Sequence, residues 1–247
     1  MKNENIELEQ IEIHTFKLIQ KVLNCLATSE YIYASGDSIA VRAYTPYKRD
    51  LEDVDLIFHS KTDIKDLKEY VSKELPDLEI HQFIELGNSN GFLRTKHKIG
   101  FFYHKEHYFI FDFHVGGSVF KGKFGCEVDD IFFETRNTMK VASFGEMENI
   151  LIPVSSVEEI ILFKLRKFKG KDLQDILSLL SMKGKYNLDY IKSRFDTYGK
   201  EAILQNVENL QSEIDQNINS WRIHHNGINF SATMKRHLQF NLKQLLD

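Results

Sequence analysis

The spacing of apolar residues divides the chain into a first part that alternates helices with strands and a second part that is helical. Between residues 6 and 27 apolar side chains recur at the three- and four-residue spacing of one helix face. The short apolar run Tyr31–Ala34, which Gly36 ends, predicts a strand, and the residues that follow up to Ala43 predict a helix. Asp63–Glu74 has the pattern of a second amphipathic helix with a capping residue at its start.

Alternation of apolar and polar residues becomes the dominant pattern beyond Leu78. The strands that it predicts are Leu78–Phe83, much of Gly91–Tyr103, Tyr108–Phe113 and, further along, Leu151–Val154. Lys105 and Glu106 are expected in a hairpin turn between two of these strands. For the stretch from Gly116 to Ser143, which begins with glycines, we expect loops and short strands.

Helical periodicity takes over after Ser155. The predicted helices are Ser156–Phe168, Asp172–Met182, Leu188–Tyr198, Glu201–Ile218 and Ala232–Leu246. We therefore expect an α/β (α+β) protein, with a mixed-sheet domain over residues 1–154 and an all-helical domain over residues 155–247.

Composition narrows the class of protein. Of the 247 residues, 42% are hydrophobic and 28% charged, as in ordinary globular proteins, and neither a signal peptide nor a membrane-spanning run is predicted. Cys25 and Cys126 lie far apart in sequence, so we expect two structural thiols in a reducing cytoplasm. The net charge of −4 argues against a mainly non-specific nucleic-acid binder, although the segment from Lys164 to Lys171 is locally basic.

Three aspartates are the residues most indicative of chemistry. Asp53 and Asp55 alternate with apolar neighbours on a predicted strand, so both side chains leave the same face. Asp112 is an isolated acid in the apolar strand that follows. Buried carboxylates are costly unless something neutralises them, and a divalent cation is a suitable partner. If the two strands are neighbours, three carboxylates converge on a metal site of the kind used in phosphoryl transfer.

The order of these residues resembles the nucleotidyltransferase superfamily typified by DNA polymerase β. The resemblance rests on Gly36 and Ser38 after a strand, Asp53 and Asp55 on the next strand, and the later Asp112. It implies that Gly36 and Ser38 bind the phosphates of a nucleoside triphosphate such as ATP. It also implies that the three acids bind Mg²⁺ or Mn²⁺ and act in catalysis. Asp37, at a position where the family has a small residue, departs from the pattern.

A narrower resemblance extends into the helical part, toward small bacterial nucleotidyltransferases of the abortive-infection (AbiEii) toxin type. It rests on the segment from Ser156 to Lys164 and on Lys171–Ile176, together with Arg49 before the first acid. It implies that Lys164, Lys171 and Asp172 contact or border the nucleotide. The implied acceptor is a hydroxyl of an RNA end, a protein or a small molecule, and a cognate antitoxin is a candidate partner.

Each of these residues also has a structural interpretation. Gly36 can serve as a turn residue, Ser38 and Asp172 as helix caps, and Lys164 as a surface residue. Asp112 can pair with a core histidine, for which His114 is placed on the same face. Arg166, Lys167 and Lys169 are expected on a solvated basic face. The alternative functions are a catalytically degenerate fold that only binds a nucleotide or a partner, and a metal-dependent nuclease.

Overall fold

The computed structural model describes residues 2–45, 51, 53–102, 105–120, 123–143, 149–168, 170–182, 184–217 and 232–247. The helices are α1 (Lys2–Ala27), α2 (Asp37–Tyr44), α3 (Ile64–Glu74), α4 (Asp130–Glu134), α5 (Val157–Lys167), α6 (Gly170–Leu180), α7 (Leu188–Ser193), α8 (Phe195–Tyr198), α9 (Lys200–Asn217) and α10 (Ala232–Leu246). The strands are β1 (Tyr33–Ser35), β2 (Asp53–Phe58), β3 (Glu79–Glu85), β4 (Gly91–Phe102), β5 (Lys105–Val115), β6 (Gly117–Phe120), β7 (Lys123–Glu127), β8 (Asn137–Ala142) and β9 (Asn149–Val154).

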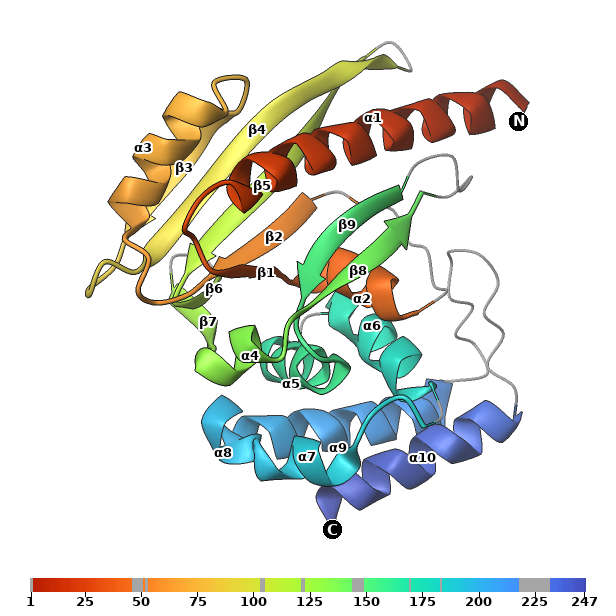
Figure 1. Ribbon diagram of the computed structural model, residues 1–247. Helices are drawn as coiled ribbons and strands as arrows, with labels where there is room; N and C mark the ends of the chain where they lie inside the picture. Colours follow the sequence, from red (N-terminus) through yellow and green to blue (C-terminus); the bar gives the residue numbers. More distant parts are fainter. Residues whose placement is uncertain are drawn as a thin grey trace.

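Seven strands form one mixed sheet in the order β3-β4-β5-β2-β1-β9-β8 (Figure 1). The pairs β2–β5 and β1–β9 are parallel, and the other neighbours are antiparallel. β6 and β7 form a separate two-stranded hairpin. The predicted mixed α/β class is therefore confirmed, and the two parallel pairs bring residues together that are far apart in sequence.

Helix α1 covers one face of this sheet and leaves the acidic residues on the other. The hydroxyl of Tyr33 donates a hydrogen bond of 3.4 Å to the carbonyl of Leu23 in α1. Phe58 is paired with Tyr33, so it faces the same helix. Because side chains alternate along a strand, Asp53 and Asp55 point to the opposite face. The helical part of the chain, beginning with α5, lies on that side (Figure 1).

Three predicted segments differ from the structure. Lys105 and Glu106, which were expected in a hairpin turn, are the first residues of β5 and pair with Phe102 and Phe101. The stretch from Gly116 to Ser143 contains the expected short strands β6, β7 and β8, and it differs from the prediction in also forming the helix α4. The predicted helix over Leu188–Tyr198 is divided into α7 and α8 at Arg194.

Arg194 interrupts that helix at the centre of a charged network. Its Nε donates to Glu159 of α5 at 2.9 Å, and its Nη1 and Nη2 donate to Asp129 at 2.8 and 2.7 Å. Tyr190 and Tyr198 donate their hydroxyl groups to the same Glu159 at 2.8 and 2.6 Å. Glu159 is fully buried, so this ring of donors compensates for its desolvation. The network fixes α7 and α8 against α5 and the start of α4.

The Asp129→Asn variant is expected to lose less of its free energy of unfolding than the wild type does when the pH is lowered. Partial burial raises the pKa of Asp129, but the hydrogen bonds and charge of Arg194 outweigh it and lower that pKa below its ordinary value. Such a carboxylate stabilises the fold above its unfolded-state pKa of about 4, and its contribution disappears as the pH falls through the lower folded-state pKa.

Urea unfolding at a series of pH values from neutral to about pH 2.5 measures this effect, with the exposed Asp189→Asn as a control. The wild type is expected to exceed Asp129→Asn in stability at neutral pH, and the difference should vanish in acid. A difference that stays constant across the series would contradict the assignment.

The strands end at Val154 and α5 begins at Val157, close to the predicted boundary at residue 155. Ser156 caps α5 by accepting a hydrogen bond from the Glu159 amide at 3.3 Å. One hydrophobic cluster nevertheless runs from Phe16 of α1 to Leu245 of α10. The predicted division into two domains stays a prediction, and the sheet and the helices share a core.

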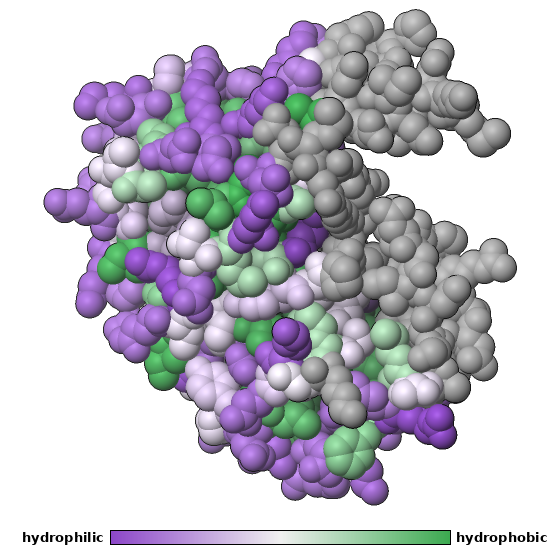
Figure 2. Space-filling view, turned by 45° about the vertical axis from the view of Figure 1, so that its right-hand side comes forward, coloured by the Kyte–Doolittle hydropathy of each residue, from purple (hydrophilic) through white to green (hydrophobic). Residues whose placement is uncertain are grey.

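Exposed apolar side chains are scattered over the described surface. On the face drawn in Figure 2, hydrophobic residues lie in small groups among hydrophilic ones. The large exposed hydrophobic residues are Ile32, Tyr108, Ile131, Leu151 and Phe240. None of the helices in the described ranges is long and apolar enough to cross a membrane.

Candidate metal and nucleotide site

Three neighbouring strands align charged residues in one row across the sheet. In the parallel pair β2–β5, Asp55 lies opposite Asp112, and in the antiparallel pair β4–β5, Asp112 lies opposite Arg94. Directly paired residues share a face, so the three side chains leave the same side of the sheet. Asp53 precedes Asp55 by two residues on that side and is half-buried. The strand order thus brings Asp55 and Asp112 side by side, with Asp53 further along the same face.

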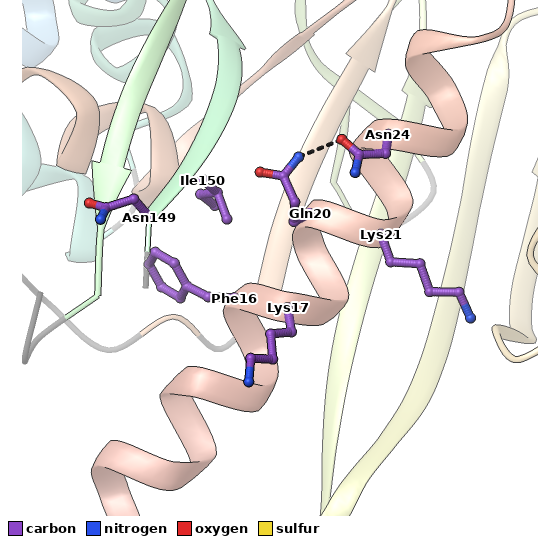
Figure 3. A pocket seen from close by; sticks show the side chains of 7 residues that line it. All are labelled: Phe16, Lys17, Gln20, Lys21, Asn24, Asn149 and Ile150. Atoms are coloured by element: carbon purple, nitrogen blue, oxygen red, sulfur yellow. Dashed lines mark hydrogen bonds between the residues drawn. The ribbon is translucent and has the colours of Figure 1, made fainter. Parts of the chain in front are cut away.

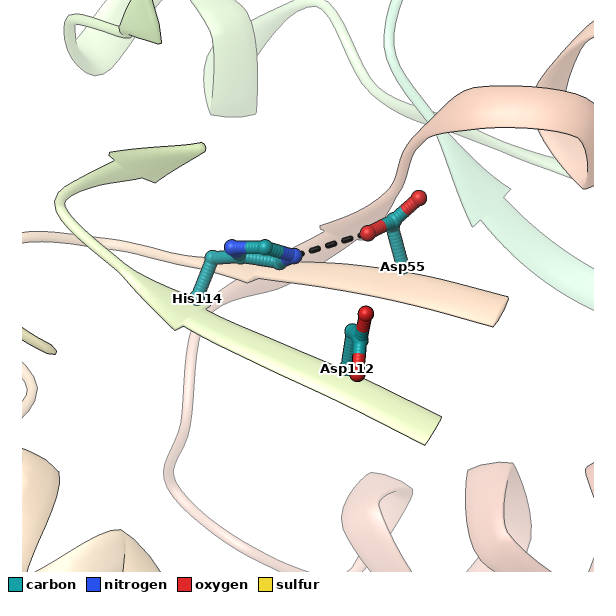
Figure 4. A group of neighbouring side chains, drawn as sticks. All are labelled: Asp55, Asp112 and His114. Carbon is teal, nitrogen blue, oxygen red and sulfur yellow. Dashed lines mark hydrogen bonds and ion pairs between the residues drawn. The ribbon is translucent and has the colours of Figure 1, made fainter. Parts of the chain in front are cut away.

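Asp55 is flanked by two nitrogen-bearing side chains, those of His114 and Lys167. It is buried, and one of its carboxylate oxygens lies 2.7 Å from Nε2 of His114 (Figure 4). Its other oxygen lies 4.0 Å from Nζ of Lys167, whose side chain is only 4% exposed. Lys167 belongs to α5, so the helical part of the chain contributes directly to the acidic site.

Asp112 is paired with Arg94. The guanidinium Nε donates to Oδ1 of Asp112 at 2.7 Å and Nη2 donates to Oδ2 at 2.5 Å, a two-pronged arrangement. The hydrogen bonds with Asp112 raise the pKa of Arg94 above its ordinary value, and the charges of Asp112, Asp53 and Asp55 act in the same direction against partial burial. All three aspartates are therefore close enough to influence this one guanidinium.

The turn between β1 and α2 packs against Asp55. The amide of Gly36 donates a hydrogen bond of 2.9 Å to the carbonyl of Asp55. A Cβ at position 36 would lie 2.9 Å from Cδ1 of the buried Ile57 and 3.7 Å from Cβ of Asp55, so only glycine fits without displacement. Ser38 is buried in the first turn of α2. A helix start beside an acidic site can bind the phosphates of a metal-bound nucleotide.

Lys164, Asp172 and Asp175 form a buried triad between α5 and α6. Nζ of Lys164 donates to Asp172 at 2.8 Å and to Asp175 at 2.7 Å, and all three side chains are essentially inaccessible to water. Asp172 thus bonds to this lysine from the first turn of α6. Lys171 also lies in that turn, but its side chain is outside the described part of the structure.

The expectation of a solvated face at Lys167 is wrong, because that side chain is buried against Asp55 and the ring of Phe163. Arg94 and Lys167 are the site residues that sequence reasoning missed. In the sequence, Arg94 is a charged residue on the same strand face as the apolar Phe92, which is unusual. Its role became evident only from its pairing with Asp112. Arg49 and Lys169 lie outside the described residues.

The donor set fits a divalent cation in part. Asp55, Asp112 and His114 each offer one ligand atom, and these atoms lie within 4.8 Å of one another. Two carboxylates and an imidazole suit Mn²⁺ at least as well as Mg²⁺, which prefers oxygen alone. Asp53 lies on the same face as a further carboxylate. The pairing of Asp112 with Arg94 opposes such a cation, because a second positive charge would lie close to it.

A surface groove on the α1 side of the sheet is separate from these acids. It has a volume of about 400 Å³ and lies between α1 and the start of β9 (Figure 3). Its lining residues are Phe16, Lys17, Gln20, Lys21, Asn24, Asn149 and Ile150. Gln20 and Asn24 are hydrogen-bonded to each other, and Lys21 is paired with Asp77, so these polar groups already have protein partners.

Comparison with solved structures supports the fold. The protein JHP933 from Helicobacter pylori is 15% identical, with a TM-score of 0.52 over 96% of this chain and 92% of that one. A "putative nucleotidyltransferase from H. pylori" is 16% identical, with a TM-score of 0.48 over 94% of this chain and 93% of that one. The first likeness establishes a common fold, and the second is too loose to carry an argument. No protein-family model and no curated protein is similar enough to this sequence to count as a match.

Proposed function

We propose that this protein is a metal-dependent nucleotidyltransferase that moves a nucleoside monophosphate from a nucleoside triphosphate to a hydroxyl group. The observation that carries the proposal is the convergence on Asp55 of the Gly36 turn, Asp112 and His114. A phosphate-binding turn beside a row of acids is what transfer of a nucleotidyl group needs. The resemblance in the order of Gly36, Asp55 and Asp112 points to the same chemistry.

In this proposal each part of the site has a distinct role. Gly36 and Ser38, at the start of α2, bind the phosphates, while Asp53, Asp55 and Asp112 hold Mg²⁺ or Mn²⁺. A cation held there would stabilise the charge that develops on the transferred phosphoryl group. Asp112 is the proposed acceptor of the proton of the attacking hydroxyl, a role that requires its release from Arg94.

We assign the α5–α6 corner to the nucleotide as well. Lys167, which reaches Asp55, and Lys171 in the first turn of α6 are the proposed phosphate contacts. Lys164 bonds to Asp172, so its proposed part is to fix this corner in place. Direct contact of Lys164 with a phosphate would require the buried triad to open.

The acceptor is a hydroxyl of an RNA end, a protein side chain or a small molecule. The abortive-infection resemblance adds a toxin role, with a cognate antitoxin as partner and the cytoplasm as the place of action. Growth arrest upon induced expression, relieved by co-expression of a neighbouring gene product, would support that role.

Incubation with each α-labelled nucleoside triphosphate, Mg²⁺ or Mn²⁺ and a cell lysate tests the proposal directly. The expected result is label in a macromolecule or a small product, together with release of unlabelled pyrophosphate. Separate RNA, protein and small-molecule fractions identify the acceptor class. Label released as free nucleotide would indicate a phosphohydrolase instead, and unlabelled nucleotides released from the RNA fraction would indicate a nuclease.

A catalytically degenerate fold is the second candidate, and one observation favours it. Asp112 is paired with Arg94, and Asp55 with His114 and Lys167, so the acids already have partners within the protein. Such a protein would bind a nucleotide or a partner with no pyrophosphate release. Equilibrium binding of a nucleoside triphosphate without any transfer to the three acceptor classes would favour this function.

A further inference from the structure

The two oxygens of Asp112 are both taken by the guanidinium of Arg94. Asp112 is almost completely buried, with 5% of its side chain exposed, whereas 35% of the Arg94 side chain is exposed. The carboxylate is therefore fixed in the sheet, and its partner has an open path to solvent. A long, flexible side chain at the edge of a buried acidic site can move without disturbing the core.

A divalent cation and the Arg94 guanidinium compete for the same carboxylate. A cation bound to Asp55 and Asp112 would lie within a few ångströms of the guanidinium, where like charges repel strongly in a partly buried site. The two hydrogen bonds from Arg94 engage both oxygens of Asp112 and offset its negative charge, so Asp112 is a weaker metal ligand while Arg94 is bound to it. Binding of the Arg94 guanidinium to Asp112 and binding of the divalent cation are thus linked, so that each weakens the other.

We propose that Arg94 is an internal counter-ion that occupies Asp112 when no cation is bound and must leave it when a divalent cation binds. This inference rests on the proposed function in placing the cation at Asp55 and Asp112. Gly36 and Ser38, the proposed phosphate contacts, follow β1 and so lie beyond Asp55 from Arg94, which is on β4. Arg94 therefore limits cation binding from the side of the site opposite the phosphate-binding turn.

Mn²⁺ binding to the whole chain, measured by electron paramagnetic resonance of free Mn²⁺ without nucleotide, tests the proposal. Arg94→Met is expected to bind Mn²⁺ about tenfold or more tightly than the wild type, since the loss of a charge-assisted pair is worth at least that factor. Arg94→Lys should fall between them, because lysine keeps the charge and loses the two-pronged geometry. The exposed Arg236→Met is the matched control and should bind like the wild type.

A second measurement needs no substitution. The Nε–Hε nuclear magnetic resonance signal of Arg94 in the wild type should move on addition of Mg²⁺, as its hydrogen bond with Asp112 breaks.

The outcomes separate this proposal from the function on which it rests. Equal Mn²⁺ affinity in wild type and Arg94→Met, with an unmoved Arg94 signal, overturns the counter-ion role and leaves the cation site intact. If neither the wild type nor any of the variants binds Mn²⁺, both the counter-ion role and the proposed cation site are overturned. Tighter binding in Arg94→Met that disappears in Arg94→Met/Asp55→Asn supports both.

Discussion

Asp55→Asn is expected to lower nucleotidyl transfer by about two to three orders of magnitude, the scale set by loss of one preorganised charge-stabilising group. Asp55 is the point at which the Gly36 turn, His114 and Lys167 meet. Asparagine keeps the shape of the side chain and an acceptor oxygen for His114, so the fold should persist. The charge that a divalent cation needs is removed.

Label transfer from an α-labelled nucleoside triphosphate at saturating Mg²⁺ measures this effect, with Asp53→Asn expected to behave in the same way. The surface variant Asp77→Asn carries the same chemical change at an exposed ion pair with Lys21 and should retain full activity. Near wild-type turnover in Asp55→Asn would remove this residue from the metal site.

Lys164→Met is expected to reduce the free energy of unfolding by about 3–5 kcal/mol, the usual effect of removing one member of a buried charge cluster. Asp172 and Asp175 would be left as two buried carboxylates without their shared cation. The effect is on the fold first, and any loss of transfer should parallel the loss of folded protein. Urea unfolding followed by circular dichroism measures it.

The triple variant Lys164→Met/Asp172→Asn/Asp175→Asn is the decisive control, because it removes the uncompensated charges together with the lysine. It should recover much of the stability that Lys164→Met loses, since an intact buried ion cluster adds little net stability. The exposed Lys243→Ala on α10 should change stability by less than about 0.5 kcal/mol. A Lys164→Met protein as stable as the wild type would show that the triad is not formed.

Much of the fold could be predicted because its elements carry strong local patterns. The stripe of α1, the cap of α3 at Asp63 and the alternation of β4 and β5 are each encoded within about ten to twenty residues. The short helix α4 was not predicted, because its five residues are too few to show a helical periodicity. The break between α7 and α8 depends on Glu159 and Asp129, which the local helical pattern cannot reveal.

The candidate site was predicted only as far as its acids. Asp53 and Asp55 share a face by simple alternation, and the apolar surroundings of Asp112 marked it as unusual. Their cationic neighbours depend on strand register and helix packing, which a single sequence does not fix. Arg94 can be assigned to the site only when the β4–β5 register is known, because that register places it beside Asp112. Lys164 and Lys167 both belong to α5, and only the packing of this helix shows that Lys167 reaches Asp55 whereas Lys164 bonds to Asp172.

The parallel pairing of β1 with β9 has a consequence for synthesis on the ribosome. Ser35 pairs with Val154, so the strand that leads into the Gly36 turn has an open edge until more than half of the chain has been made. Open strand edges are templates for intermolecular pairing. Nascent chains that stop before residue 149 should therefore aggregate or engage chaperones more than chains that continue past residue 154. In the cell, protection of the β1 edge then depends on the timing of translation as well as on the finished sequence.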